Sequence, residues 1–179
     1  MLRFSSLVPA WKLGLMICIG CASALGSSGC ERRLGPGSVA PDFVVQALDG
    51  KVTKLSNFRG RPVLLNLWAT WCPPCIEELP FLNKIQERYA GRGLVVLGVA
   101  GDEKPDNVRT FIGTHPISFP ILLDPEGVVG TNYGITGYPE SFLIDRDGKL
   151  AAKYVGPLPL AKGDVSDEVI ARLESLIGG

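Results

Sequence analysis

The chain has 179 residues, 46% of them hydrophobic, and its 18 Lys and Arg residues balance 18 Asp and Glu residues. This length and composition suit one globular domain with a short extension. The zero net charge argues against the strongly basic surface by which proteins bind nucleic acid, so we expect no nucleic-acid partner. Three of the five Cys residues precede residue 31, which leaves one pair for the domain and excludes a scaffold held by several disulfides.

The first 30 residues have the pattern of an export segment. Arg3 and Lys12 bracket a short basic region, and residues 13–25 are uncharged and mostly apolar or small. A basic start before an apolar run is typical of a secretory signal, and this run is short for a helix that spans a membrane. We therefore predict that residues 1–30 direct the protein out of the cytoplasm.

Three outcomes for this segment stay open. Cleavage after Ala22-Ser23-Ala24, which is similar to a signal-peptidase site, would release a soluble domain. Ser28-Gly29-Cys30 resembles the end of a bacterial lipobox, although Ser27 stands where that motif prefers Leu, and would give a lipid-anchored Cys30. Without cleavage, the segment would remain as an anchor. We favour the lipoprotein, and each outcome places the domain outside the cytoplasm.

The first elements of the domain follow a polar segment. Residues 31–38 are polar and contain Gly and Pro, which predicts a linker before a domain at 39–179. Residues 43–47 have the pattern of a strand, Asp49-Gly50 is typical of a tight turn, and residues 51–53 return as a second strand. The sequence therefore predicts a β-hairpin at the start of the domain.

A buried strand and an amphipathic helix come next. Residues 63–67 form a short apolar run that is rich in β-favouring side chains, as in a buried strand. Apolar residues then recur at helical spacing, and Gly91-Arg92-Gly93 is a helix stop signal. The apolar side of this helix consists of Ile76, Leu79, Leu82, Ile85 and Tyr89. The segment between strand and helix contains both remaining Cys residues.

The rest of the chain continues to alternate between strands and helices. The turn Asp145-Arg146-Asp147-Gly148 is expected to join the last two strands as a hairpin, and Asp164 or Ser166 is a candidate cap of the last helix. This alternation predicts an α/β sandwich with parallel strands at its centre. We predict strands at 94–100, 121–123, 140–144 and 150–155, and helices at 105–112, 127–133 and 164–177.

Cys72 and Cys75 are the candidate redox pair. Cys72 is expected near the N-cap of the helix, and Pro73 suits the first helical position because its missing N–H would be unpaired there. The positive end of the helix dipole and the free N–H groups stabilise a thiolate at this place. Cys75 lies on the same helix face, within disulfide reach. An attacking thiolate with a second thiol that resolves the mixed disulfide is sufficient for thiol–disulfide exchange.

The segment Trp71-Cys72-Pro73-Pro74-Cys75 after an apolar strand resembles the thioredoxin-like proteins. More narrowly, it is similar to the membrane-tethered TlpA, ResA and DsbE/CcmG group of thiol:disulfide oxidoreductases, within the redoxin superfamily. The resemblance extends from Pro36 to the C-terminus and implies a thioredoxin fold, with a central mixed β-sheet flanked by helices, an N-terminal β-hairpin extension and a central insertion. Further motifs occur in the order of that group, namely Ala40-Pro41-Asp42-Phe43, Leu48-Asp49-Gly50-Lys51, Leu55-Ser56-Asn57-Phe58-Arg59-Gly60 and Gly137-Tyr138-Pro139-Glu140-Ser141-Phe142-Leu143-Ile144-Asp145.

The resemblance also implies roles for residues around the cysteines. Glu78, one helical turn after Cys75, would relay protons to and from that thiol. A cis peptide between Tyr138 and Pro139 would pack beside the cysteines, and the Tyr138 backbone would pair with a bound peptide. Glu140, which follows the proline as in the DsbE/CcmG members, would help to set partner choice.

Two tryptophans flank the cysteine motif. We expect Trp71 to belong to an exposed docking surface for the substrate, together with Pro73 and Pro74, and Trp68 to lie in the core.

Four other sites receive less specific expectations. Asn66 stands where thioredoxins proper carry an acidic residue, and in this it matches the TlpA-like pattern. Glu77 is expected to face solvent, Asp102-Glu103-Lys104 to form a solvated loop, and His115 to lie in a surface loop.

These features predict a thiol:disulfide oxidoreductase without a cofactor. The single pair of cysteines must be re-reduced by an outside donor after each turnover, and we expect this donor to be a membrane electron carrier of the thiol–disulfide type. The resemblance implies a reductant in cytochrome c maturation, whose client is an apocytochrome c or a heme-handling thiol protein.

Two other functions remain as alternatives. A thiol peroxidase of the redoxin type shares the motifs before the cysteines, but it needs a Thr three residues before the reactive Cys, where this chain has Ala69. A metal-carrier module of the copper-delivery type needs a longer cysteine spacing and a distal His. A zinc site would need two further ligands, and the domain offers only His115, so we expect no metal.

Overall fold

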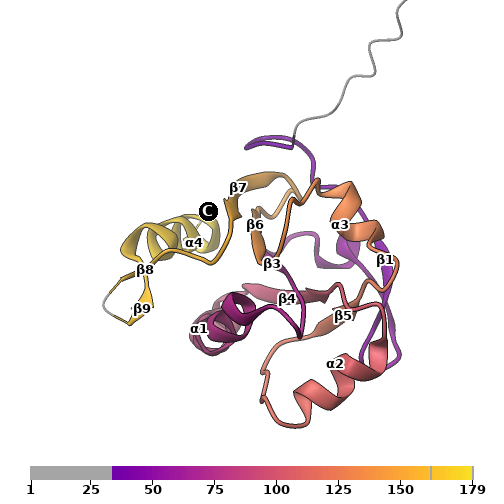
Figure 1. Cartoon of the computed structure of the whole chain (residues 1–179). Helices are drawn as coiled ribbons and strands as arrows, with labels where there is room; N and C mark the ends of the chain where they lie inside the picture. The colour runs from indigo at the N-terminus through magenta and orange to yellow at the C-terminus, as the bar shows by residue number, and fades with distance from the viewer. Residues whose placement is uncertain (1–33, 162, 179) are drawn as a thin grey trace, which may run out of the picture. The chain divides into compact units, whose positions relative to one another are not determined.

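A computed structural model describes residues 34–161 and 163–178. Within them, a mixed β-sheet is flanked by helices on both faces (Figure 1). The predicted export segment, with the candidate lipidation site Cys30, lies outside the described residues. In the described part of the chain, no helix is both long and apolar enough to cross a membrane.

The sheet has seven strands, with parallel pairs only at its centre. β3 pairs in parallel with β4, and β4 pairs in parallel with β5, whereas all the other neighbours in this sheet are antiparallel. The predicted central parallel strands and the hairpin between the first two strands are therefore confirmed. In spatial order the strands are β2 (Val52–Lys54), β1 (Val44–Ala47), β5 (Ile121–Leu123), β4 (Val95–Ala100), β3 (Val63–Trp68), β6 (Glu140–Ile144) and β7 (Leu150–Val155).

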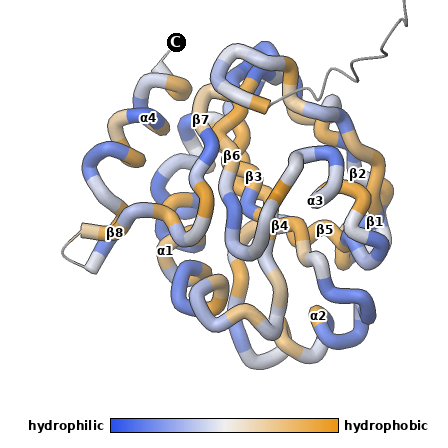
Figure 2. The backbone as a smooth tube through the Cα atoms, turned by 45° about the horizontal axis from the view of Figure 1, so that its top comes forward, coloured by the Kyte–Doolittle hydropathy of each residue, from blue (hydrophilic) through white to orange (hydrophobic). Residues whose placement is uncertain are grey.

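Alternation along the central strands divides the core into two apolar layers. Every residue of β3 and β4 is buried, as expected for strands covered on both faces. Successive side chains point to opposite faces, so Leu64 and Trp68 pack in one layer, while Leu65 and Leu67 pack in the other. Figure 2 shows the hydrophobic residues gathered in these central strands.

Helices cover both layers. On the side of Leu64 and Trp68, the covering helices are α1 (Pro73–Tyr89), α2 (Pro105–Ile112) and α4 (Asp167–Gly178). On the other side, α3 (Val128–Asn132), the short 3-10 helix η1 (Leu55–Phe58) and the start of the domain complete the core. A second 3-10 turn, η2 (Ala90–Arg92), ends α1 where Gly93 takes a left-handed conformation, as the predicted stop signal indicates.

The folded domain begins earlier than expected from the sequence. Gly37 donates a backbone hydrogen bond to Leu150, and Leu150 donates one to Ser38. Val39 then forms an isolated bridge with Lys149. The described end of the predicted linker at 31–38 therefore belongs to the domain, because its polar backbone groups find partners at the start of β7.

The C-terminal helix begins later than expected. Asp164 and Val165 form β9, which pairs with β8 (Leu160–Ala161) in a small separate ribbon, so Asp164 is not a helix cap. The helix α4 starts at Asp167, and the Ser166 carbonyl accepts the first helical hydrogen bond from Ile170. The Ser166 hydroxyl is buried without a partner, so its side chain does not cap the helix.

Candidate active site around the Cys72–Cys75 disulfide

Cys72 and Cys75 form a disulfide where β3 leads into α1, with their Cα atoms 5.3 Å apart. Cys72 is the N-cap residue in an extended conformation, and Pro73 takes the first helical position. The Cys72 sulfur accepts a hydrogen bond from the Cys75 backbone N–H at 3.3 Å. This N–H and the helix dipole would stabilise a thiolate at Cys72 once the disulfide is reduced.

The disulfide is itself buried, whereas Trp71 and Pro73 beside it are exposed. Cys72 is 4% and Cys75 1% exposed, but the Trp71 side chain is 65% exposed. The Trp71 ring packs edge-on against Tyr138, with ring centroids 5.7 Å apart. Trp68 is completely buried, as expected. The exposed Trp71 ring and the half-buried Tyr138 ring therefore form an aromatic pair next to the buried disulfide.

The peptide bond between Tyr138 and Pro139 is cis, as the motif implies. Glu140 follows at the start of β6 with its side chain buried. One carboxylate oxygen accepts hydrogen bonds from the N–H and the hydroxyl of Thr136, and the other lies 2.8 Å from the Lys153 ammonium. Glu140 therefore stabilises the turn before Pro139, and its buried side chain is not part of the exposed surface.

Glu78 lies on the inner side of α1, one turn after Cys75, and is only 2% exposed. Its Oε1 accepts a hydrogen bond from the Leu158 backbone N–H at 2.8 Å, and its Oε2 accepts one from the Asn66 amide at 3.3 Å. Burial raises the pKa of Glu78 to about 7, although the two hydrogen bonds oppose this rise. The neighbouring Glu77 is exposed, so the two adjacent carboxylates differ as expected.

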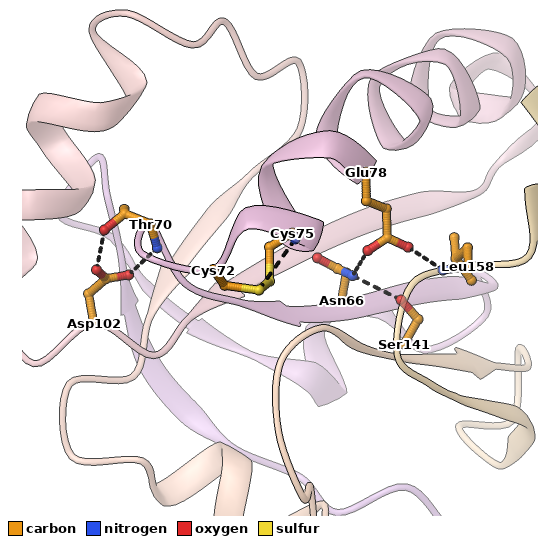
Figure 3. Close-up of a disulfide and its surroundings, with 8 residues drawn as sticks. All are labelled: Asn66, Thr70, Cys72, Cys75, Glu78, Asp102, Ser141 and Leu158. Carbon is orange, nitrogen blue, oxygen red and sulfur yellow. Dashed lines mark hydrogen bonds between the residues drawn. A yellow bond between two sulfur atoms is a disulfide. The ribbon is translucent and has the colours of Figure 1, made fainter. Parts of the chain in front are cut away.

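Asn66 joins this carboxylate to the adjacent strand. Asn66 on β3 lies opposite Ser141 on β6 in the antiparallel register, and its amide nitrogen contacts the Ser141 hydroxyl at 2.9 Å. Figure 3 shows Asn66, Glu78, Ser141 and Leu158 on the Cys75 side of the disulfide. We define these four residues as the Glu78 cluster.

A second buried carboxylate lies on the Cys72 side. Asp102 is 2% exposed, and its carboxylate accepts hydrogen bonds from both the backbone N–H and the hydroxyl of Thr70 (Figure 3). The expectation of a solvated loop at residues 102–104 is thus wrong for Asp102. Trp68 and Ala100 are partners in the parallel register, so the residues that follow β3 and β4 emerge side by side. Polar residues just past the carboxyl ends of parallel strands often belong to a functional site, which was the signal available in the sequence.

The Tyr138 ring packs against Gly101, the residue before Asp102. A side chain at Gly101 would overlap the Tyr138 hydroxyl, so the absence of a Cβ at Gly101 makes room for this ring. Burial raises the pKa of the Tyr138 hydroxyl, with smaller contributions from Asp124 and Asp102. Tyr138 is therefore a neutral phenol that connects Trp71 to the loop after β4.

The chain is similar in sequence to known redox proteins. The family model described as redoxin matches residues 36–168. The chain belongs to the redoxin family. It is 37% identical over 126 residues to the thiol-disulfide oxidoreductase ResA of Bacillus thuringiensis, which covers 70% of this chain and 73% of the relative. It is also 37% identical over 130 residues to the thioredoxin-like protein YneN of Bacillus subtilis, covering 72% of this chain and 76% of that protein.

Solved structures agree with this family assignment. A putative thiol:disulfide interchange protein DsbE from Chlorobium tepidum superposes with a TM-score of 0.75 at 36% identity, covering 81% of this chain and 99% of that one. A mycobacterial dsbF structure gives a TM-score of 0.65 at 27% identity, covering 75% and 94%. The predicted thioredoxin fold and the resemblance to ResA and DsbE are thus confirmed. This redoxin protein is a thiol-disulfide oxidoreductase of the ResA/DsbE type.

The sequence identified the cysteines but missed several of their neighbours. The patterns in the sequence predicted no role for Asn66. They also did not predict that the Ser141 hydroxyl and the Leu158 N–H contact the site. Asn66 could have been found from its polar amide in an otherwise apolar strand, since a buried polar group needs hydrogen-bond partners. Leu158 contributes through its backbone, for which no side-chain pattern exists.

Two residues bear on the alternative functions. His115 lies on the surface, as expected, and its ring stacks on Phe111 with centroids 3.9 Å apart. Ala69, at the position where a redoxin peroxidase would carry a hydroxyl, is fully buried in the apolar core. Neither position supports the peroxidase or the metal carrier.

Proposed function

We propose that this oxidoreductase works outside the cytoplasm as a reductant of selected protein disulfides in cytochrome c maturation. The similarity to ResA and DsbE supports the thiol–disulfide chemistry. The export pattern of residues 1–30 and the lipobox-like Cys30 support a tethered protein outside the cytoplasm. Its domain would comprise the predicted residues 39–179 together with Gly37 and Ser38, which pair with Leu150.

The first step is attack by Cys72. In the reduced protein, the Cys72 thiolate lies at the N-terminus of α1 beside the exposed Trp71. It attacks one sulfur of the client disulfide, a new Cys72–client bond forms, and the second client sulfur leaves as a thiolate that takes up a proton. The Tyr138 backbone beside Pro139, with the Trp71, Pro73 and Pro74 surface, would hold the client chain during this step.

The second step is resolution by Cys75. Its thiol loses a proton, the thiolate attacks the Cys72 sulfur, and the client leaves with its second cysteine reduced. The buried Glu78 one helical turn away is the proposed acceptor of this proton, because its pKa of about 7 suits proton transfer near neutral pH. A membrane dithiol donor then reduces the Cys72–Cys75 bond and itself becomes a disulfide.

The observation that carries the proposed exchange chemistry is the buried Glu78 one helical turn after the resolving Cys75. Glu78 is 2% exposed and held by the Leu158 and Asn66 hydrogen bonds. A thiol that is 1% exposed, as Cys75 is, has little access to water as a proton acceptor. The Glu78 carboxylate provides an acceptor inside the protein.

The equilibrium potential against glutathione tests the direction of electron flow. A value below about −200 mV supports a reductant, and a value near −120 mV, at the oxidising end of the thioredoxin-like range, overturns this direction. We expect fast reduction of an oxidised Cys-x-x-Cys-His peptide and weak reduction of insulin. Equal rates with both substrates would contradict a narrow client range.

The cellular role has its own test. Deletion of the gene should lower holo-cytochrome c, and an added thiol reductant should restore it. A Cys75→Ser variant should accumulate the mixed disulfide with its client, which mass spectrometry can identify. Cell fractionation with mass spectrometry of the mature N-terminus distinguishes lipidated Cys30, cleavage before Leu25 and an uncleaved anchor.

A further inference from the structure

Asn66 has an unused hydrogen-bonding group inside the active site. The side chain is 1% exposed, and its amide nitrogen contacts Glu78 Oε2 and Ser141 Oγ. Among the residues that the structure describes, its Oδ1 is one of the few buried side-chain atoms without a partner. A buried carbonyl oxygen without a donor costs free energy, so this atom calls for an explanation.

The orientation of the amide follows from its neighbours. The amide nitrogen donates to Glu78 Oε2 and to Ser141 Oγ, an orientation that suits the ionised Glu78 carboxylate because it only accepts hydrogen bonds. The oxygen then points the other way, and Figure 3 shows it turned toward the side of Cys75. In the oxidised protein described here, Cys75 is bonded to Cys72 and carries no proton to donate.

Reduction changes what Cys75 can offer. A dithiol donor breaks the Cys72–Cys75 bond, becomes a disulfide itself, and leaves a proton on the Cys75 sulfur. This thiol is buried, so it needs an acceptor within the protein. Each Glu78 oxygen accepts one hydrogen bond, from Leu158 or from Asn66, and keeps capacity for a proton. The Asn66 oxygen accepts none, so it is the acceptor that gains most from a buried S–H donor.

We propose that Asn66 is a positioning residue for the redox step, whose amide oxygen accepts the Cys75 S–H in the dithiol form while its amide nitrogen holds Glu78. The inference rests on the proton-relay role proposed for Glu78. The amide does not itself carry the proton, which passes from the Cys75 sulfur to the Glu78 carboxylate. Asn66 thereby stabilises the dithiol relative to the disulfide, in which its oxygen has no partner.

The test compares Asn66→Ala with wild type in equilibrium with glutathione. Loss of one hydrogen bond that is present only in the dithiol should shift the equilibrium about threefold to tenfold toward the disulfide. This corresponds to a potential about 15 to 30 mV more negative. A merely structural role would weaken both redox forms equally and leave the potential unchanged, which would overturn the proposal.

A matched control is available on α1. Asn83 also uses its amide for hydrogen bonds, to Pro116 and Ser118, but it lies at the surface away from the cysteines. Asn83→Ala should leave the potential within error of wild type. A shift in Asn83→Ala as large as that in Asn66→Ala would contradict a specific effect of Asn66.

A double variant separates the two functions of the amide. If Asn66 also acts through Glu78, then Asn66→Ala should slow resolution by Cys75 in the wild-type background but not further in Glu78→Gln. Additive rate losses would overturn the coupling. The comparison is relative to wild type, so it holds whether the absolute potential identifies a reductant or an oxidant.

A measurement on the unmodified protein covers the case in which Asn66→Ala does not fold. The ¹⁵N side-chain amide resonances of Asn66 and Asn83 can be compared between the oxidised and reduced forms. We expect the Asn66 signals to shift on reduction and those of Asn83 to stay. An Asn66 resonance that does not change on reduction would overturn the proposal.

Discussion

Two buried carboxylates lie on opposite sides of one disulfide, and they serve it differently. Asp102 binds the backbone N–H and hydroxyl of Thr70, two residues before Cys72. Glu78 binds one backbone N–H and one amide, with Cys75 a helical turn away. The hydrogen bonds between Asp102 and Thr70 hold the backbone just before Cys72. The Glu78 cluster instead contains a carboxyl whose pKa of about 7 lets it take up and release a proton near neutral pH.

The difference between them lies in their location. Asp102 follows a strand end and is held to a neighbouring strand end, so its hydrogen bonds close a loop. Glu78 lies in the first turns of a helix, on the face that packs on the sheet, so burial dominates and raises its pKa to about 7. Similar exposure of the two residues therefore does not imply similar chemistry.

The largest expected effect concerns the pH dependence of stability on the Glu78 side. The pKa of Glu78 is about 7 in the folded protein and lies near 4.5 in the unfolded chain, so the folded form holds the proton more tightly. The contribution of Glu78 to the free energy of unfolding should be fully present below the unfolded pKa of about 4.5. It should be lost as the pH rises through about 7, which lowers the free energy of unfolding by about 3 kcal/mol. Glu78→Gln should lack this loss.

Urea unfolding of the oxidised protein at about pH 5 and about pH 8.5 measures this difference. Asp102→Asn is the matched control, because it removes the buried carboxylate on the other side of the disulfide and keeps Glu78, so the loss between the two pH values should remain. If wild type and Glu78→Gln lose stability in parallel between the two pH values, Glu78 does not have the raised pKa.

The next effect concerns catalysis at the same residue. Glu78→Gln should slow disulfide exchange about a hundredfold near pH 8, because the acceptor of the Cys75 proton is lost. The wild-type rate should rise with pH through about 7, and the variant should lose this rise. Stopped-flow reduction of a model disulfide provides the rates. An unchanged rate in a folded variant would make Glu78 a structural residue.

A smaller effect is expected on the Asp102 side. Asp102→Asn weakens the two hydrogen bonds that hold Thr70, so the free energy of unfolding should fall by about 2 kcal/mol. The exchange rate should change much less than in Glu78→Gln, and its pH profile should keep the wild-type shape. A lost pH profile in Asp102→Asn would remove the distinction between the two carboxylates.

The smallest effect is expected at the exposed Trp71, next to the disulfide. Trp71→Ala removes the edge-on contact with Tyr138, and stability should change by less than about 1 kcal/mol because Trp71 is exposed. Affinity for an oxidised client peptide should fall about threefold to tenfold, since the docking surface loses its largest side chain. Steady-state kinetics with the Cys-x-x-Cys-His peptide measures it, and an unchanged KM would exclude Trp71 from client binding.

Local patterns in the sequence were sufficient for most of the fold. The apolar run before Cys72 predicted a buried strand, and β3 is buried at every residue. Helical spacing after Cys75 predicted α1 and the burial of Leu79, Leu82, Ile85 and Tyr89, whereas Ile76 is only half-buried. At the C-terminus, Asp164 was placed in a helix but forms β9 with β8, because that pairing depends on a second segment and not on local spacing.

By itself, the sequence determined the cysteine pair, because the helix start at Cys72 and the spacing that brings Cys75 within disulfide reach are both local. It also determined the family, through motifs that extend along most of the chain. Only the tertiary structure decided which polar residues are buried beside the disulfide. Asn66, Ser141 and Leu158 come from distant segments that strand pairing and helix packing bring together around Glu78. Burial then set the pKa of that carboxyl, since desolvation depends on everything packed around a group and not on its neighbours in the chain.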